Sequence, residues 1–138
     1  MDVKGAVALV TGGNGGLGQR ICHALAGQGV HIGVMYVQSR DQADDVVRGL
    51  ASRHQIEAAA FGCDITDAGA VSRVVGDITA RFGRLDILVN DAAYNVAISF
   101  PDLHGMTMEE WDKIISINLT GPFLCSQSAA GKGPASVI

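Results

Sequence analysis

Apolar residues along this chain fall into two alternating patterns. Four short runs are apolar and mostly rich in β-branched side chains, as is typical of strands buried in a parallel sheet: residues 6–10, 30–37, 58–61 and 85–90. Between them, apolar side chains recur every three or four positions, which predicts helices over about residues 17–25, 41–54 and 71–82, the last one capped by Thr66. This alternation predicts an α/β fold, a Rossmann-type doubly wound parallel sheet with right-handed crossovers.

The last third of the chain predicts one more helix and the start of a fifth strand. Thr107 and Glu110 have the spacing of a capping box at the start of this helix. Its apolar face is formed by Trp111, Ile114, Ile115, Leu119 and Phe123. Asn118 and the Gly121-Pro122 pair are poor helix residues, so we expect a local irregularity there. Residues 135–138 resemble the start of a strand, and we therefore expect a sheet truncated near the start of its fifth strand.

A glycine-dense stretch joins the first predicted strand to the first predicted helix: Thr11-Gly12-Gly13-Asn14-Gly15-Gly16-Leu17-Gly18. Such a turn leaves free backbone N–H groups at the positive end of the helix dipole, which suits the pyrophosphate of a dinucleotide. The alternative is a tight turn that needs only residues able to adopt positive φ. The flanking strand and helix favour the first interpretation. We therefore expect one dinucleotide-binding domain over residues 1–138, incomplete at its C-terminal end, with Thr11, Gly12, Asn14, Gly16, Leu17 and Gly18 as cofactor-binding candidates.

Residues that follow the other predicted strands are candidates for the same site, because ligands bind outside the carboxyl ends of the strands in such sheets. They are Tyr36, Ser39, Arg40, Asp64, Ile65, Asn90 and Ala92. A site for NAD places a carboxylate after the second strand to bind the ribose 2′-hydroxyl, and residues 35–40 contain none. Ser39 and Arg40 favour NADP, since arginine pairs well with a 2′-phosphate, although NAD stays possible. The alternative for Arg40 is a solvated position near the start of the next helix.

Composition narrows the class of protein further. With 138 residues, 48% of them hydrophobic and 17% charged, the chain resembles one globular domain. The net charge of −4 argues against a nucleic-acid partner. The sequence has no run of about eighteen consecutive apolar residues, so we expect no membrane-spanning helix. Cys22, Cys63 and Cys125 are expected to be buried thiols, and without a signal-peptide pattern we expect a cytoplasmic location. The four histidines lack metal-ligand spacing, so no metal site is expected.

Four motifs, in this order, are similar to those of the amino-terminal part of the short-chain dehydrogenase/reductase family. The matching residues are Thr11-Gly12, Gly16 and Gly18 for the family's Thr-Gly-x-x-x-Gly-x-Gly loop, Asp64-Ile65 for its Asp-hydrophobic pair, Asn90-Asp91-Ala92-Ala93 for its Asn-Asn-Ala-Gly motif, and Trp111 to Phe123 for its fourth helix. The resemblance implies an NAD(P)-dependent oxidoreductase that transfers hydride between nicotinamide and a small alcohol or carbonyl substrate. It also implies that Asp64 contacts the adenine, that Asn118 joins a proton relay, and that the fourth helix forms a homo-oligomer interface.

The chain departs from the family pattern in three respects. Its last predicted helix is short by roughly two turns, because Ala129-Ala130 runs straight into Gly131-Lys132-Gly133. Asp91 and Ala93 stand where the motif has asparagine and glycine. The family's catalytic serine and Tyr-x-x-x-Lys pair would lie beyond Ile138, and neither Tyr36 nor Tyr94 is followed by lysine four residues later. The 138 residues are therefore expected to be inactive in hydride transfer by themselves. Two classes stay open: part of an NADP-dependent oxidoreductase, or a non-catalytic dinucleotide-binding module or inactive fragment.

Overall fold

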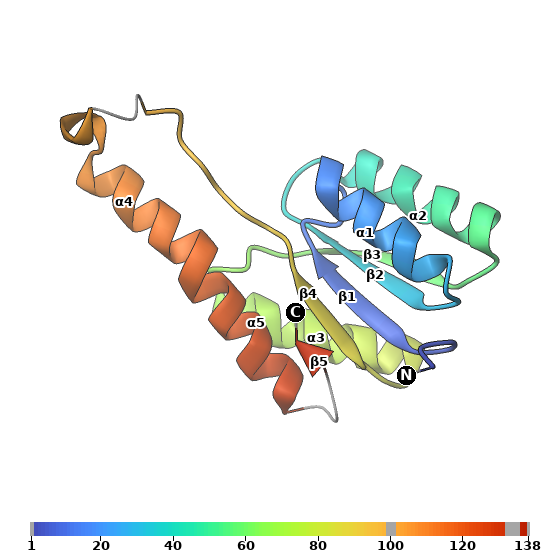
Figure 1. Ribbon diagram of the computed structural model, residues 1–138. Helices are drawn as coiled ribbons and strands as arrows, with labels where there is room; N and C mark the ends of the chain where they lie inside the picture. The colour runs from blue at the N-terminus through green and yellow to red at the C-terminus, as the bar shows by residue number, and fades with distance from the viewer. Residues whose placement is uncertain (1, 99–101, 132–135, 138) are drawn as a thin grey trace.

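A five-stranded parallel sheet with helices on both faces forms the molecule (Figure 1). The computed structural model describes residues 2–98, 102–131 and 136–137. The elements run β1 (Val7–Thr11), α1 (Gly16–Ala26), β2 (His31–Tyr36), α2 (Arg40–His54), β3 (Ala58–Gly62), α3 (Ala68–Phe82), β4 (Ile87–Asn90), η1 (Leu103–Gly105), α4 (Met108–Ile115), η2 (Ser116–Thr120), α5 (Gly121–Ala130) and β5 (Ser136–Val137). The strand order β3-β2-β1-β4-β5 confirms the predicted Rossmann-type α/β fold, including the start of a fifth strand.

The two faces of the sheet are covered by different helices, so alternate residues of each strand enter different cores. Ala8 and Val10 of β1 pack with the buried side chains of α1 and α2. Leu9 points to the other face, where α3 and α5 supply the buried side chains. Figure 1 shows this layering, with α1 and α2 on one side of the sheet and α3 and α5 on the other. The near-continuous burial of β1 explains why its sequence is apolar at every position but the last.

β1 lies at the centre of the sheet and aligns its carboxyl end with those of its neighbours. Thr11 is in register with Met35 of β2 and with Asn90 of β4. The segments that leave β1, β2 and β4 therefore emerge side by side at one edge of the sheet. This edge is the place where the strand-end candidates were expected to meet.

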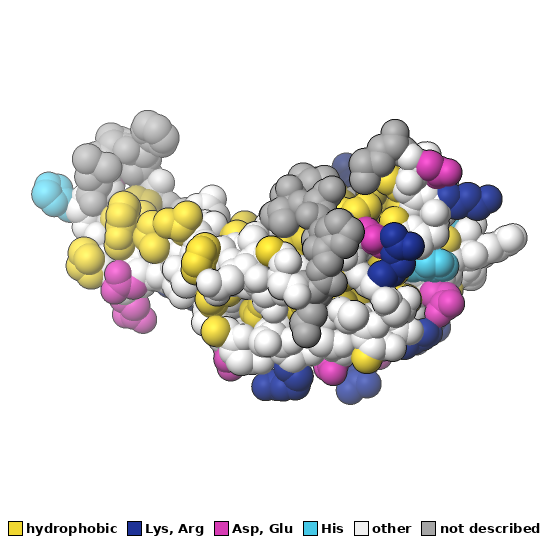
Figure 2. All heavy atoms as spheres, turned by 90° about the horizontal axis from the view of Figure 1, so that it is seen from below, with side chains coloured by type: hydrophobic (Ala, Val, Ile, Leu, Met, Phe, Trp, Pro, Cys, Tyr) yellow, Lys and Arg dark blue, Asp and Glu magenta, His cyan; other side chains and the backbone are white. Residues whose placement is uncertain are grey.

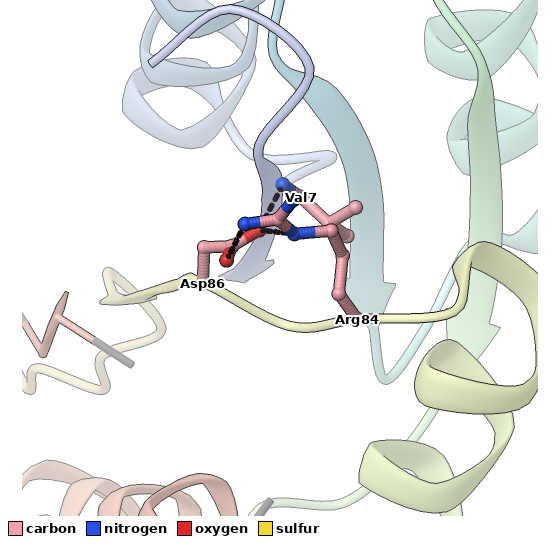
Figure 3. Close-up of polar contacts among 3 residues, drawn as sticks. All are labelled: Val7, Arg84 and Asp86. Atoms are coloured by element: carbon pink, nitrogen blue, oxygen red, sulfur yellow. Dashed lines mark hydrogen bonds and ion pairs between the residues drawn. The ribbon is translucent and has the colours of Figure 1, made fainter. Parts of the chain in front are cut away.

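The opposite edge is held by a charged cluster that closes the start of β4 onto β1 (Figure 3). The Asp86 carboxylate accepts a hydrogen bond from the Val7 backbone N–H at 2.8 Å and two from the Arg84 guanidinium at 2.7 Å each. Burial alone would raise the pKa of Asp86, but the hydrogen bonds from Arg84 and Val7 and the charge of Arg84 outweigh it and lower the pKa. The cluster fixes the register of these strands far from the candidate site.

α4, η2 and α5 form one long rod in which η2 is a π-helical turn (Figure 1). Pro122 has no N–H to donate within the helix, and Gly121 donates to the Ser116 carbonyl, five residues back. This is the local irregularity that the sequence predicted around Asn118 and Gly121-Pro122. Trp111, Leu119 and Phe123 are at least half exposed along the rod, and Figure 2 shows hydrophobic side chains gathered there.

Two expectations about helix starts had different outcomes. Thr107 caps α4 as predicted, since its hydroxyl oxygen accepts a hydrogen bond from the Glu110 N–H at 3.1 Å. The predicted cap of α3 was wrong by one residue: Asp67 is the N-cap, and its carboxylate accepts from the Ala70 N–H at 3.0 Å. Thr66 instead donates its hydroxyl to the Asp64 carboxylate. In the described part of the chain, no helix has the length and apolarity needed to cross a bilayer.

Two histidine rings join the C-terminal ends of α1 and α2. His23 Nδ1 lies 2.9 Å from His54 Nε2, and the ring centroids are 5.2 Å apart. At least one ring must be neutral for this hydrogen bond, because two protonated rings offer only donors. Desolvation, followed by the nearby charges of His54 and Arg53, lowers the pKa of His23 below that of an ordinary histidine. The contact between these two helices is therefore sensitive to acid.

We expect the free energy of unfolding to decrease as the pH falls below about 6.5, the pKa of histidine in an unfolded chain. Below that pH the unfolded chain takes up a proton that the folded state binds less readily at His23, so the unfolded state gains relative stability. Urea unfolding at about pH 7.5 and 5.5 measures the difference, which should shrink in His23→Gln. His104→Gln, at an exposed position in η1, is the control. An equal decrease in the wild type and His23→Gln would refute this role of the pair.

Candidate functional site

A cavity of about 720 Å³ lies at the carboxyl edge of the sheet. Its walls are the segments that follow β1, β2, β3 and β4, together with one side of α4 and η2. Nine of the residues predicted from the sequence line it: Gly12, Asn14, Gly16, Leu17, Tyr36, Ser39, Asp64, Ile65 and Ala92. Its volume lies within the range of small-molecule and cofactor sites.

The glycine loop presents the start of α1 to this cavity. No side chain caps α1, whereas α3 and α4 are capped by Asp67 and Thr107. The N–H groups at the start of α1 therefore stay available to a ligand, and the helix dipole favours an anion there. A Cβ on Gly16 would meet no atom of the described residues within 4 Å, so the space before the helix is open.

Gly12 and Gly18 give the loop its shape. Gly12 has a φ of +65°, and a Cβ on it would lie 3.0 Å from the Ala92 Cα. A Cβ on Gly18 would overlap the Gly12 carbonyl oxygen. The first glycine thus lets the loop pass close to the segment after β4, and the second lets α1 pack against the loop. Gly18 supports the cavity without lining it.

Thr11, at the end of β1, connects the glycine loop to the segment after β4. Its hydroxyl oxygen accepts hydrogen bonds from the N–H groups of Asp91 and Ala92, both at 3.0 Å, and donates to the Val89 carbonyl at 3.4 Å. Thr11 is the only fully buried polar residue among those described. Its role is therefore to position the cavity wall, since it does not itself face the cavity.

The end of β2 forms the next part of the wall. The Asn14 side-chain amide donates to the Gln38 carbonyl at 3.0 Å, which ties the glycine loop to this segment. Ser39 lies in the cavity wall with a φ of +61°. Arg40 points elsewhere: its guanidinium lies 3.6 Å from the Asp44 carboxylate, and it lines a second cavity of about 240 Å³. Both side chains of this pair are well exposed, and such pairs contribute little stability.

Asp64 and Ile65 follow β3, as expected, and both line the cavity. The Asp64 carboxylate accepts hydrogen bonds from the Thr66 N–H at 2.9 Å and from the Thr66 hydroxyl at 2.7 Å. Ile65 is buried, and a Cβ on Gly121 would lie 2.7 Å from its Cγ1. The absence of a side chain at Gly121 therefore lets α5 approach this end of the cavity.

Asn90 and Asn118 do not line the cavity. The Asn90 amide donates to the Ser126 hydroxyl at 3.4 Å, and its buried Oδ1 has no hydrogen-bond partner among the described residues. The Asn118 side chain bridges the Tyr94 backbone, accepting from its N–H and donating to its carbonyl, both at 2.8 Å. Asn118 thereby fastens η2 to the segment after β4. Ala93, where the family motif has glycine, does not have a positive φ.

Several cavity residues were not found from the sequence. Tyr94 donates its hydroxyl to Glu110 at 2.8 Å, and the Lys113 ammonium lies 4.0 Å from the centroid of the Tyr94 ring. Both Tyr94 and Lys113 line the cavity, as does Gln42. Gln42 lies one turn after Ser39 on α2, a spacing that the sequence offered as a signal. Lys113 had no such signal, because only the tertiary fold brings α4 to the cavity.

The three cysteines are free and buried, as predicted. Burial is the main cause that raises the pKa of Cys22 to about 12 and the pKa values of Cys63 and Cys125 to about 11. All three are therefore neutral thiols near neutral pH, including Cys63 in the cavity wall. No cluster of three or more potential metal-ligating side chains occurs in residues 2–98, 102–131 and 136–137.

Comparison with known proteins accounts for this arrangement. Residues 6–132, most of the chain, match the family described as short chain dehydrogenase. The chain belongs to the short-chain dehydrogenase/reductase family. Its four strand-end segments and the helix α4 all lie within the matched region.

Individual members of the short-chain dehydrogenase/reductase family match over about half their length. The chain is 35% identical over 123 residues to 3-oxoacyl-[acyl-carrier-protein] reductase of Staphylococcus aureus, covering 88% of this chain and 48% of the relative. A short-chain dehydrogenase from Burkholderia cenocepacia in complex with NADP has a TM-score of 0.85 at 34% identity, covering 96% of this chain and 52% of the other. NAD⁺-bound xylitol dehydrogenase has a TM-score of 0.88 at 26% identity, covering 96% and 49%.

Proposed function

We propose that this chain forms the NADP-binding part of a short-chain oxidoreductase that transfers hydride between the nicotinamide and a small alcohol or carbonyl substrate. The observation that carries the proposal is the uncapped start of α1, which faces the open space beside Gly16 in the main cavity. Free N–H groups at the positive end of a helix suit a pyrophosphate. The similar solved structures with NADP and with NAD⁺ support a nicotinamide cofactor.

In this proposal, different segments of the cavity wall bind different parts of the cofactor. The start of α1, from Gly16, holds the pyrophosphate, and the Asp64-Ile65 segment lies against the adenine. Ser39 lies in the cavity wall after β2, where no carboxylate is present to favour a free 2′-hydroxyl. The Arg40 guanidinium reaches a 2′-phosphate by leaving Asp44, with which its exposed ion pair is weak. NADP is therefore the expected cofactor, with NAD as the alternative.

Hydride transfer to a carbonyl also requires a proton donor. The 138 residues contain no Tyr-x-x-x-Lys pair. We therefore propose that they bind the cofactor but do not catalyse the reaction by themselves. Asn118 is proposed to take part in the proton relay of the whole enzyme, held in place by its two hydrogen bonds to Tyr94. Three free, buried thiols support the cytoplasm as the location.

Arg40→Ala is expected to weaken NADPH binding about tenfold and to leave NADH binding nearly unchanged, because only NADPH carries the 2′-phosphate. Fluorescence titration of the whole chain with each nucleotide measures both affinities. The wild type is expected to bind NADPH more tightly than NADH. Arg48→Ala is the matched control, because Arg48 also lies on α2 and pairs with an aspartate, Asp45, outside the cavity. Tighter binding of NADH by the wild type, or an equal loss of both nucleotides in Arg40→Ala, would contradict the assignment.

We also propose that the rod of α4, η2 and α5 packs against a second copy of the chain. Trp111 is 50% exposed, Leu119 64% and Phe123 61%, an apolar surface that is costly to leave in water. Phe123→Glu is expected to shift a dimer towards monomer in analytical ultracentrifugation, because it places a charge in the contact. Ala80→Glu, at an exposed position on α3, should leave the equilibrium unchanged. A wild-type monomer at all accessible concentrations would exclude this interface.

A further inference from the structure

Asp91 lies where the segment after β4 meets the glycine loop. Its N–H donates to the Thr11 hydroxyl oxygen at 3.0 Å, which fixes its backbone, and it lines the main cavity. The next residue, Ala92, passes so close to Gly12 that a Cβ on the glycine would lie 3.0 Å from the Ala92 Cα. Asp91 therefore belongs to the same wall of the cavity as the uncapped start of α1.

The Asp91 carboxylate has no compensating partner among the described residues. It forms no ion pair within 4 Å, and no described side chain or N–H group donates a hydrogen bond to it. The negative charge of Asp91 adds to the burial that raises the pKa of the Cys22 thiol on α1 to about 12, so this thiol is neutral. The other titratable groups of the cavity are Tyr36, Cys63, Asp64, Tyr94 and Lys113.

Lys113 is the one cation among these groups, and its ammonium is held over the Tyr94 ring at 4.0 Å from the centroid. Desolvation raises the pKa of Asp91 above that of an ordinary aspartate. The cavity wall in which the start of α1 favours an anion thus also contains Asp91, a partly buried acid. A pyrophosphate bound there lies near a neutral carboxyl group when Asp91 is protonated and near a negatively charged carboxylate at higher pH.

We propose that Asp91 makes dinucleotide binding dependent on pH, so that the cofactor binds more tightly when Asp91 is protonated and binding is accompanied by proton uptake. This inference rests on the proposed cofactor function of the cavity. The sign follows from charge: ionised Asp91 repels the pyrophosphate, so affinity falls as the pH rises. By linkage, a bound pyrophosphate must in turn favour the protonated form of Asp91 by the same factor.

Asp91→Asn tests the inference, because the amide keeps the shape of the side chain and cannot ionise. The affinity of the whole chain for NADP⁺, which is stable in acid, is measured by isothermal titration calorimetry between about pH 4, near the ordinary pKa of aspartate, and pH 8, in buffers of different ionisation enthalpy that report proton uptake. The 2′-phosphate of NADP⁺ titrates identically with both proteins, so its effect cancels in the comparison. Asp112→Asn is the matched control, since Asp112 is exposed on α4 outside the cavity. Asp91→Ser is a second neutral variant in case the amide disturbs folding.

Relative to Asp91→Asn, the wild type is expected to lose affinity as the pH rises, on the order of tenfold between the fully protonated and the fully ionised form of Asp91. It should also take up more protons on binding than Asp91→Asn, whereas Asp112→Asn should behave as the wild type. Equal pH profiles and equal proton uptake in the wild type and Asp91→Asn would overturn the role of Asp91 and leave the cofactor site intact. If neither folded protein binds NADP⁺ at any pH, the proposed function itself fails, and this inference fails with it.

Discussion

Gly18→Ala is expected to destabilise the chain by about 3 kcal/mol and to abolish NADPH binding. The added Cβ would overlap the Gly12 carbonyl oxygen and lie 2.9 Å from both the Gly12 carbonyl carbon and the Gly13 Cα. These are backbone atoms of a loop that is fixed on both sides, so they cannot yield as a flexible side chain can. In an ordinary helix the same substitution would stabilise by up to about 1 kcal/mol, so the sign alone is informative. Urea unfolding and NADPH titration measure the two effects.

Gly16→Ala, two residues earlier on the same helix, separates stability from binding. Its Cβ would meet no described atom within 4 Å, so we expect unchanged or slightly higher stability. The methyl group would nevertheless enter the space in front of α1, and NADPH affinity is expected to fall. If Gly18→Ala were as stable as the wild type, the close contact between α1 and the loop would not exist as described. If Gly16→Ala bound NADPH normally, the pyrophosphate would lie elsewhere.

Thr11→Val is expected to reduce the free energy of unfolding by about 2–3 kcal/mol. Valine has nearly the shape of threonine, but it leaves the N–H groups of Asp91 and Ala92 without their acceptor and the Val89 carbonyl without its donor. The residue is 1% exposed, so water cannot replace the hydroxyl without a rearrangement. NADPH affinity should fall as well, because these bonds position the wall beside the glycine loop. Equilibrium unfolding in urea and nucleotide titration measure both changes.

Thr11→Ser is the control, because serine keeps the hydroxyl group and removes only a methyl group. We expect it to lose about 1 kcal/mol and to retain most of the NADPH affinity. Equal losses in Thr11→Val and Thr11→Ser would show that packing of the methyl group, and not the hydrogen-bond network, holds the two segments together.

The architecture followed from the sequence because periodicity reports which positions are buried. The predicted strand over residues 6–10 begins one residue before β1, Val7–Thr11, since pairing with β2 and β4, and not apolarity, sets its bounds. The helix caps show the same limit. Thr66 and Asp67 are both good capping residues, and only the backbone geometry, with Asp67 extended at φ −97° and ψ 104°, decides between them.

The sequence predicted those parts of the candidate site that are formed by residues directly after strands. The prediction was incomplete where the site depends on the direction of a side chain. The loop from Gly12 to Leu17 needs only local sequence, and it faces the cavity as expected. Arg40 is adjacent in sequence to Ser39 but turns towards Asp44, one helical turn later, a choice that the spacing of residues did not reveal. Lys113 reaches the cavity only because a rod anchored by Asn118 passes beside it.

Nuclear magnetic resonance of the ¹⁵N-labelled chain titrated with NADPH tests whether the cavity at the carboxyl edge binds a nicotinamide dinucleotide through the start of α1. We expect the amide signals of Gly15, Gly16 and Leu17 to shift together with those of Ser39 and Ile65. The amide of Val7, which donates to Asp86 at the opposite edge of the sheet, should not shift. If saturation with NADPH left the glycine-loop signals unchanged, or shifted only the signals of residues in the second cavity, the start of α1 would not be the cofactor site.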